Sequence, residues 1–536
     1  MILGFRKDQK LPLVLFGVVL LVAIAALTDA QQRNSASSEA LLRAHFQGLS
    51  AMGADTNLTV FHAVHDLPET RKLTSKTIDR IAVYLAASWS REDRALLTRQ
   101  KFLVPVLTDL LERESYLEVW AGANGNSEWS VATRLPGARA RLWEITFREA
   151  IGQAPSTLPW GKVSGFESTN LIPKNPLTLA RVGEWTLLAG GSKLSTNVGL
   201  CADLLKLGHP KSSGNPHWLE ADLETSRFGP WAGLARKLGI GHSHWSVVTR
   251  KNALRTEATF AREAASKWTF QPWQMPTNLM HDPLIGFTAL QGIAPLIAES
   301  GLFKKLQWDE APNQLFLWAQ PTSFATMFGA APLKKPSSAV LKIAEKGLPL
   351  FREFLGTNLP GTIIVATNIP AITWRDLPVG TPFVRSESTG FLHFGLIPLQ
   401  EAGNPPPAEL LEQVTSRTNL IYYDWEVSEA RLQHWPAASQ FSSLAASLYL
   451  DPNATAADEW IRALQTKVTG NVVTEISATG PREWTLLRRS DLGFTSTEIA
   501  FFMRWFNSSI FPRIGFETWV DPELKKVPSL RNRAFP

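Results

Sequence analysis

The run GHSHW at residues 241–245 is the part of the sequence nearest to a serine nucleophile motif. A nucleophile elbow has the form G-x-S-x-G, because its serine sits on a strained turn between small neighbours. Trp245 occupies the position of the second glycine, and no clear strand precedes the run. The pattern therefore favours a polar loop that leads into a strand at 245–250, and it gives Ser243 no catalytic role.

The two histidines of this run could share a metal ion. His242 and His244 are one residue apart, so they would lie on one side of an extended segment. A third ligand would have to come from a distance, and the nearest histidines in sequence are His209 and His217. Two histidines do not make a metal site, so the sequence predicts exposed loop histidines, no bound metal and no cofactor.

Two pairs of carboxylates have a spacing that acid and base catalysis could use. Asp222 and Glu224 form one pair, and Asp424 and Glu426 form the other. Residues two apart on a strand share a face and lie about 6–7 Å apart. Glycosidases place two carboxyl groups about 5–9 Å apart. A solvated strand face explains each pair equally well, and repetition of the pattern favours a structural role, so we assign no catalytic residue.

Absent motifs, the single cysteine and the net charge disfavour phosphate, dinucleotide and zinc sites, disulfides and nucleic-acid binding. The chain has no G-x-x-x-x-G-K-[ST], no G-x-G-x-x-G after a strand and no H-E-x-x-H. Cys201 is the single cysteine, which excludes an intramolecular disulfide, and its apolar surroundings predict a buried thiol. A net charge of 54 − 48 = +6 over 536 residues gives no indication of nucleic-acid binding.

Tryptophan is unusually frequent, with 20 residues against 5 tyrosines. Exposed aromatic side chains could stack on sugars or grip a protein partner. Most of the tryptophans fall in stretches with strand or amphipathic helix patterns, so we expect them mainly to fill the core.

Alternating hydrophobic stretches and helical spacings predict an α+β fold with antiparallel hairpins. Strands at 116–121 and 128–134 flank Asn124-Gly125, a strong hairpin signal, and a helix runs from Pro136 to Ile151. The other predicted elements of this part are strands at 57–65, 160–168, 177–183 and 185–189 and helices within 73–113 and 195–207.

Two short patterns occur twice along the chain. Asp-x-Glu-x-Ser begins at Asp222 and again at Asp424, and W-x4-R-x5-T begins at Trp245 and again at Trp484. We interpret them as traces of an internal duplication. The sequence therefore predicts two related lobes of antiparallel strands with packed helices, at 57–270 and 280–510, followed by a C-terminal tail at 511–536.

The segment 11–28 carries no charge and is preceded by Arg6, Lys7 and Lys10. Eighteen helical residues span roughly 27 Å, which is close to the ~30 Å hydrocarbon thickness of a bilayer. A basic flank stays in the cytoplasm, so the bulk of the chain should be extracytoplasmic.

Two alternatives remain for this segment. It is an uncleaved transmembrane signal-anchor, or a signal peptide cleaved near Thr28-Asp29-Ala30. We favour the anchor, because the apolar stretch is longer than an ordinary signal peptide core. The predicted organisation is a cytoplasmic stub and signal-anchor at 1–30 and a juxtamembrane spacer at 31–56, before the first lobe.

An N-terminal anchor followed by duplicated strand-strand-helix lobes resembles uncharacterised bacterial membrane-anchored envelope proteins, of the kind classed as domains of unknown function. The resemblance covers most of the chain but rests on architecture, so it transfers no functional residue. It implies no known activity. The anchor, the duplication and the lack of a catalytic constellation favour a single-pass membrane protein with a periplasmic body that serves as a non-catalytic binding or scaffold protein, with an envelope protein or glycan as its partner. The alternative is an envelope hydrolase that acts on glycan or peptide.

Overall fold

The computed structural model describes most of residues 40–512. Gaps in this description fall at 90–92, 122–126, 152–155, 158–163, 169–176, 191–198, 212–216, 228–231, 264–267, 322–326, 351–360, 378–379, 397–402, 434–454, 469 and 508–510. The predicted anchor at 11–28, the Asn124-Gly125 turn and the tail from residue 513 lie outside the described residues. Among those that are described, no helix is both long and apolar enough to cross a membrane.

The chain folds into two compact units, and the strands of each unit pair in antiparallel fashion. The division falls between Asn252 and Ala253, where a strand that pairs within the second unit begins. Unit 1 is Met1–Asn252, Tyr449–Trp460 and Phe502–Pro536, and unit 2 is Ala253–Leu448 and Ile461–Phe501. The α+β class predicted from sequence is therefore observed in both units.

The sheet of unit 1 has the strand order β4-β5-β6-β7-β3-β2-β1-β8-β9. Its strands are β1 (Ala40–Phe46), β2 (Ser115–Ala121), β3 (Ser127–Arg134), β4 (Ser156–Thr157), β5 (Ser164–Ser168), β6 (Leu177–Val182), β7 (Trp185–Gly190), β8 (Leu219–Leu223) and β9 (Ile240–Arg250).

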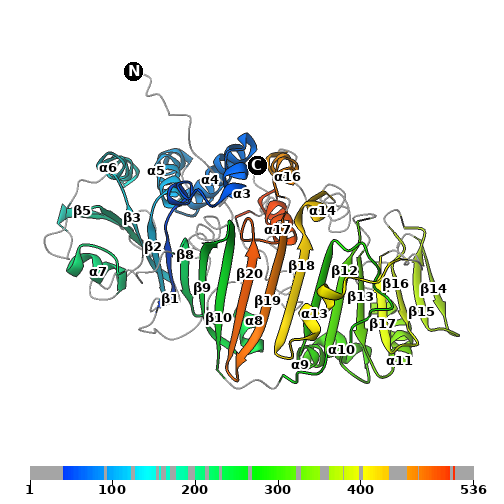
Figure 1. Ribbon diagram of the computed structural model, residues 1–536. Helices are drawn as coiled ribbons and strands as arrows, with labels where there is room; N and C mark the ends of the chain where they lie inside the picture. Colours follow the sequence, from blue (N-terminus) through cyan, green and yellow to red (C-terminus); the bar gives the residue numbers. More distant parts are fainter. Residues whose placement is uncertain are drawn as a thin grey trace. The chain divides into compact units, whose positions relative to one another are not determined.

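Three helices of unit 1 pack in sequence order, α4 (Pro68–Trp89) on α5 (Asp93–Glu112) and α5 on α6 (Gly137–Ile151), and Figure 1 shows them side by side. Phe102 of α5 meets Phe147 of α6 edge to face, and Asp109 accepts a hydrogen bond from Trp143 Nε1 at 2.8 Å. The shorter helices are α2 (Leu49–Met52), α3 (Thr59–His65), α7 (Gly199–Leu207) and α8 (Ala232–Leu238).

The sheet of unit 2 has the strand order β10-β20-β19-β18-β11-β12-β13-β17-β16-β15-β14 (Figure 1). Its strands are β10 (Ala253–Arg262), β11 (Gly286–Gln291), β12 (Gln314–Ala319), β13 (Met327–Pro332), β14 (Thr362–Ala366), β15 (Ala371–Arg375), β16 (Phe383–Ser386), β17 (Phe391–Gly395), β18 (Leu420–Val427), β19 (Asn471–Gly480) and β20 (Glu483–Ser490).

Its helices are α9 (Ala294–Glu299), α10 (Gly301–Leu306), α11 (Pro336–Lys342), the π-helical turn η1 (Ile343–Gly347), α13 (Ala408–Thr415) and α14 (Ser428–Gln433). The helices α16 (Thr455–Gln465) and α17 (Ser496–Asn507) contribute residues to both units.

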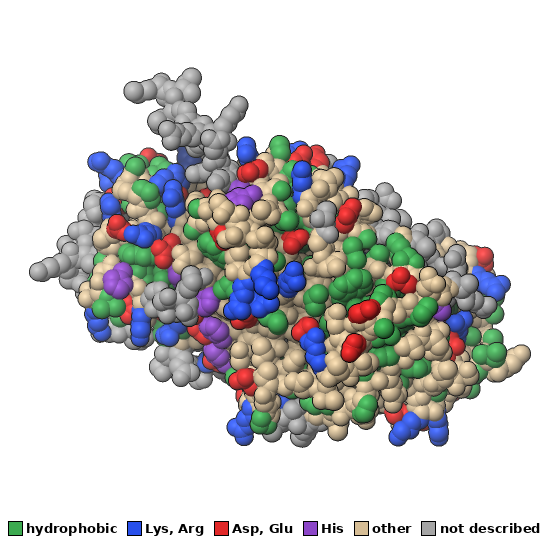
Figure 2. Space-filling view, in the orientation of Figure 1, with side chains coloured by type: hydrophobic (Ala, Val, Ile, Leu, Met, Phe, Trp, Pro, Cys, Tyr) green, Lys and Arg blue, Asp and Glu red, His purple; other side chains and the backbone are tan. Residues whose placement is uncertain are grey.

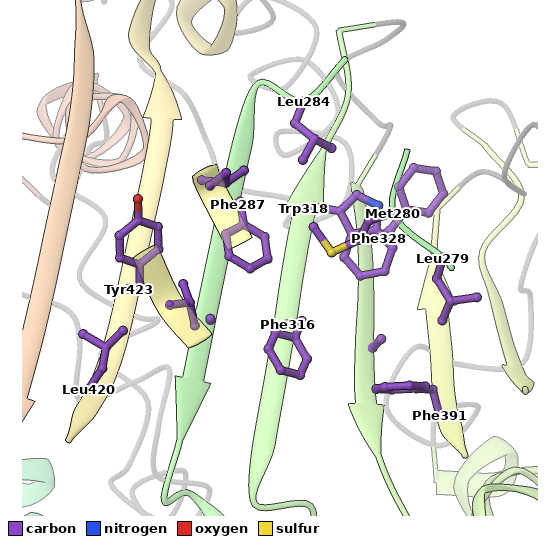
Figure 3. Close-up of a cluster of buried hydrophobic side chains, with 14 of the residues drawn as sticks. Leu279, Met280, Leu284, Phe287, Phe316, Trp318, Phe328, Phe391, Leu420 and Tyr423 are labelled. Carbon is purple, nitrogen blue, oxygen red and sulfur yellow. The ribbon is translucent and has the colours of Figure 1, made fainter. Parts of the chain in front are cut away.

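One face of the unit 2 sheet carries the apolar cluster shown in Figure 3. Phe287 on β11 lies directly opposite Trp318 on β12, so the two side chains are on the same face of the sheet. Both side chains are buried. Leu410 and Val414 are four residues apart on α13 and add one helix face to this core.

The two strand orders have the same internal plan. In unit 1, β1 lies between β2 and β8, and in unit 2, β11 lies between β12 and β18. Asp222 of β8 pairs with Arg43 of β1, while Asp424 of β18 pairs with Thr288 of β11, so the two aspartates hold the same place in their sheets.

The predicted match between Trp245 and Trp484 is wrong. Trp245 lies on β9, whose place in unit 2 is taken by β19, whereas Trp484 lies on β20. Short strands followed by polar turns resemble one another in sequence. The pattern W-x4-R-x5-T therefore occurs on two strands that do not correspond to each other.

Two further predictions near the N-terminus are also wrong. The expected strand at 57–65 is helix α3, because Leu58, Phe61 and Val64 are buried at a spacing of three. The expected spacer at 31–56 includes β1, where Leu41, Ala44 and other side chains are buried. This part of the chain is a central strand of unit 1.

Candidate functional site

Ser243 is a buried structural residue. The predicted loop at 241–245 is instead part of β9, which begins at Ile240. The Ser243 hydroxyl lies 2.7 Å from the Thr225 hydroxyl and accepts a hydrogen bond from Trp245 Nε1 at 2.9 Å. Its neighbours His242 and His244 point to the other face of the strand, so neither can take the Ser243 proton.

His242 and His244 face the carboxylate of Asp222 on the neighbouring strand. The Asp222 Oδ1 atom lies 2.9 Å from His244 Nδ1 and 3.7 Å from His242 Nε2. The side chains are 48%, 40% and 42% exposed for Asp222, His244 and His242. The two histidines singled out from the sequence thus meet one of the singled-out acids, at a position open to solvent.

A second carboxylate extends this cluster. Glu220 lies two residues before Asp222 on β8, 4.0 Å from His244 Nε2 and 3.9 Å from His217 Nδ1. Three histidines, His217, His242 and His244, therefore lie close to two carboxylates, those of Glu220 and Asp222. Histidine side chains are visible at the surface of the molecule in Figure 2. In the described part of the chain, no group of three or more His, Cys, Asp or Glu residues is arranged to hold a metal ion.

Two other residues named from the sequence do not join this cluster. The His209 Nδ1 atom is 2.9 Å from the backbone oxygen of Pro210, so this histidine interacts locally. Glu224 follows the end of β8, and its backbone N–H donates to Leu41 O at 2.9 Å. Asp222 therefore lies on the strand and Glu224 lies just beyond its end, so the two acids do not form the predicted pair on one strand face.

The cluster continues across two more strands as a polar row, formed by Glu118 on β2, Arg43 on β1, Asp222 on β8 and His244 on β9. Each lies directly opposite the next in the strand register. Arg43 Nε is 3.1 Å from Glu118 Oε1, and its guanidinium lies 5.6 Å from the centre of the Trp120 ring.

Glu118 anchors one end of the polar row. Burial raises the pKa of its carboxyl, while the backbone N–H of Leu200, which donates to Oε2 at 2.8 Å, and the charge of Arg43 act in the opposite direction. Arg43, by contrast, is 54% exposed. Sequence patterns do not indicate this pair, because they predict a spacer at 31–56, where β1 lies.

The second acid pair lies in unit 2 in different surroundings. Asp424 Oδ1 accepts a hydrogen bond from the Thr288 hydroxyl at 2.6 Å, and Glu426 Oε1 accepts one from the backbone N–H of Ser496 at 2.5 Å. Burial raises the pKa of both carboxyls, against the opposing effect of the Arg431 charge. Glu426 is only 2% exposed.

The N-terminus of α17 covers this pair. Arg488 on β20 forms two hydrogen bonds of 2.8 Å with the Glu498 carboxylate and donates to the Thr474 hydroxyl at 2.9 Å. Glu498 also accepts from the backbone N–H of Thr495, while its own N–H donates to the Thr495 hydroxyl, which makes a capping box. The two acids therefore belong to a packed hydrogen-bonded network.

The remaining residues singled out from the sequence serve packing. Cys201 is buried, as predicted, and burial together with the Glu118 charge raises the pKa of its thiol to about 12. Such a thiol is protonated and unreactive at neutral pH. Five tryptophans are buried in cores, Trp143, Trp185, Trp318, Trp460 and Trp484. Most of the other described tryptophans are partly exposed, so the expectation that tryptophan mainly fills the core holds only for these five.

No known family model matches the chain, and no curated protein matches it. Among solved structures it is similar to crystal form III of TP0453, at 10% identity over 44% of this chain and 82% of that one, with a TM-score of 0.24. Crystal form IV of TP0453 gives 12% identity, 42% and 78% coverage and a TM-score of 0.23. Scores this low carry no argument about function.

Proposed function

We propose that this chain is a membrane-anchored extracytoplasmic protein that acts as a non-catalytic binding or scaffold protein of the cell envelope. The observation that carries the binding role is the polar row with its flanking histidines. Asp222 lies half-exposed between two histidines, and a solvated carboxylate of this kind is suited to contact a partner. A general acid would instead need burial to keep its proton near neutral pH.

The composition of the polar row favours a glycan or peptide as its partner. Carboxylates accept hydrogen bonds, Arg43 donates them, and neutral histidine does both, so together they satisfy hydroxyl and amide groups. Trp120 lies beside Arg43 and adds an aromatic ring of the kind that packs on sugars and peptides.

A sedimentation assay tests the binding role. The full chain in mild detergent is mixed with insoluble peptidoglycan, and the bound fraction is measured. We expect Asp222→Asn combined with His244→Ala to reduce binding several-fold. Asp66→Asn is the matched control, because Asp66 also contacts a histidine, His65 at 3.2 Å, but lies outside the row. Equal binding by the double variant and the wild type would refute this role for the row.

The anchor is proposed from the uncharged segment 11–28 and its basic flank. Fractionation of expressing cells tests it, since an anchored protein stays with the membrane after a salt wash. A soluble product that begins near Gln31 would show a cleaved signal peptide instead. We further propose that the two units are related lobes, which their shared strand plan supports.

One observation favours the alternative, an envelope hydrolase. Asp424 and Glu426 lie two apart on one strand, and burial raises the pKa of both, as in carboxylic acids that donate protons. If the wild type hydrolyses peptidoglycan and Asp424→Asn abolishes that activity while the protein stays folded, the hydrolase replaces the binding role.

A further inference from the structure

Strand β14 ends the strand order of unit 2. It pairs with β15 along one side, and among the described strands it has no other partner. An edge strand leaves a row of backbone N–H and C=O groups open to pairing with another strand. These groups make β14 a candidate for association through the backbone.

The side chains of β14 do nothing to prevent such pairing. Residues 361–373 contain no charged residue, and Ile364 and Val365 are 40% and 42% exposed. Proteins usually protect an edge with lysine, proline or a very short strand. Strand β4, which ends the strand order of unit 1, consists of only Ser156 and Thr157. Of these two strands, only β14 is long and apolar.

The register shows which backbone groups are open. The Trp374 N–H of β15 donates to Pro382 O at 2.8 Å, so the backbone groups of Trp374 point away from β14. Trp374 is the register partner of Ile363. Residues of an antiparallel ladder alternate between hydrogen-bonded and non-hydrogen-bonded pairs, so Ile363 and Val365 direct their N–H and C=O groups to the open edge.

We propose that β14 pairs with β14 of a second copy of this chain, antiparallel about a two-fold axis at Ile364. This register places Ile363 opposite Val365 of the second copy, so the open groups of both strands pair with each other. Thr362 lies opposite Ala366 of the second copy. Each copy carries a net charge of +6, but the paired strands contain no charged residue, so no like charges face each other between them. The strand complements itself, and β-branched residues facing each other across strands stabilise a sheet.

A disulfide test follows from the axis. Ile364 would face Ile364 of the second copy in a non-hydrogen-bonded pair, with Cα atoms about 4.5 Å apart, which a disulfide can bridge. The native Cys201 is buried and does not interfere. With mild oxidant, the full chain carrying Ile364→Cys in detergent should run as a dimer on a non-reducing gel.

Ile369→Cys is the matched control. Ile369 is more exposed, at 70%, but it lies beyond Ala366 in the turn after β14. The two copies of Ala366 would already be about 13 Å apart, so cysteines beyond them should form several-fold less dimer. A monomeric Ile364→Cys protein, equal cross-linking at both sites, or a disulfide to a different protein would each overturn the proposal.

A second variant tests the backbone contribution. Val365→Pro removes an N–H that points to the open edge and leaves the bonds to β15 intact. Added to Ile364→Cys, it should abolish the cross-link while the near-ultraviolet circular dichroism spectrum stays unchanged. A cross-link that survives Val365→Pro in folded protein would refute pairing through the strand edge.

Discussion

Strands β8 and β18 hold the same place in their sheets, yet their aspartates lie in different environments. The Asp222 side chain is 48% exposed and contacts two histidines, whereas Asp424 is partly buried, and this burial raises its pKa. The strand position is the same, so the difference comes from what covers each strand. In unit 2 the N-terminus of α17 supplies Ser496 and Glu498 above the acids.

The register neighbours of the two aspartates differ in a matching way. Asp222 lies between Arg43 and His244, and Asp424 lies between Thr288 and Thr474. Charged or titratable side chains thus lie on either side of Asp222, the more exposed aspartate. Side chains with hydroxyl groups lie on either side of Asp424, the more covered one. One strand plan therefore supports a surface suited to binding in unit 1 and a packed polar network in unit 2.

The largest difference between the two sites should appear when Glu426 is truncated. Glu426→Ala leaves the backbone N–H of Ser496 buried without its acceptor, which costs about 2–3 kcal/mol of unfolding free energy. Glu224→Ala, at the corresponding residue of the first pattern, should cost less than about 0.5 kcal/mol, as surface changes do. Urea unfolding followed by tryptophan fluorescence measures both, and equal losses would contradict the comparison.

A smaller loss is expected when Arg488 is replaced by lysine. The guanidinium forms two bonds with Glu498 and one with Thr474, and a lysine ammonium cannot reproduce this planar geometry. We expect Arg488→Lys to lower the unfolding free energy by about 1 kcal/mol. Arg43→Lys, at an exposed residue with one ion pair, is the control and should change it by much less. A larger effect at Arg43 would show that the row of unit 1 is the more rigid network.

The raised pKa values of Asp424 and Glu426 predict a dependence of stability on pH. Because their pKa is higher in the folded than in the unfolded state, the folded state binds these protons more tightly. Their contribution is therefore greatest below the unfolded value of about 4 and is lost as pH rises through the folded pKa.

Asparagine at position 424 does not titrate, so Asp424→Asn should flatten this part of the curve of unfolding free energy against pH. Glu426→Gln should flatten it as well. An unchanged slope in both variants would show that neither carboxyl is perturbed by burial.

The sequence predicted the α+β class, the 116–121 and 128–134 strands and a buried Cys201, because these depend on local alternation and turn residues. It also singled out Asp222, His242 and His244, although it placed the histidines in a loop. It missed Arg43 and Glu118, because a row across four strands depends on register between segments distant in sequence. The partial burial of Asp424 could not be predicted either, because α17, which lies over the acid pair, begins more than 70 residues later in the chain.

Apart from the two control variants, the smallest effect on stability is expected at Asp222, the aspartate that corresponds to Asp424. Asp222→Asn keeps an oxygen that can accept a hydrogen bond from His244, and the side chain it replaces is half in water. Exposed ion pairs contribute about 0.2–1 kcal/mol, so the loss in unfolding free energy should stay below about 1 kcal/mol.

The proposed binding role makes the opposite prediction for the same variant in the sedimentation assay. Removing the negative charge at the centre of the polar row should weaken attachment to the partner even though the fold is retained. Stability and binding therefore separate at Asp222 if the row is a contact surface. If Asp222→Asn instead costs as much stability as Glu426→Ala, the row is a structural network like that of unit 2, and its exposure has no functional meaning.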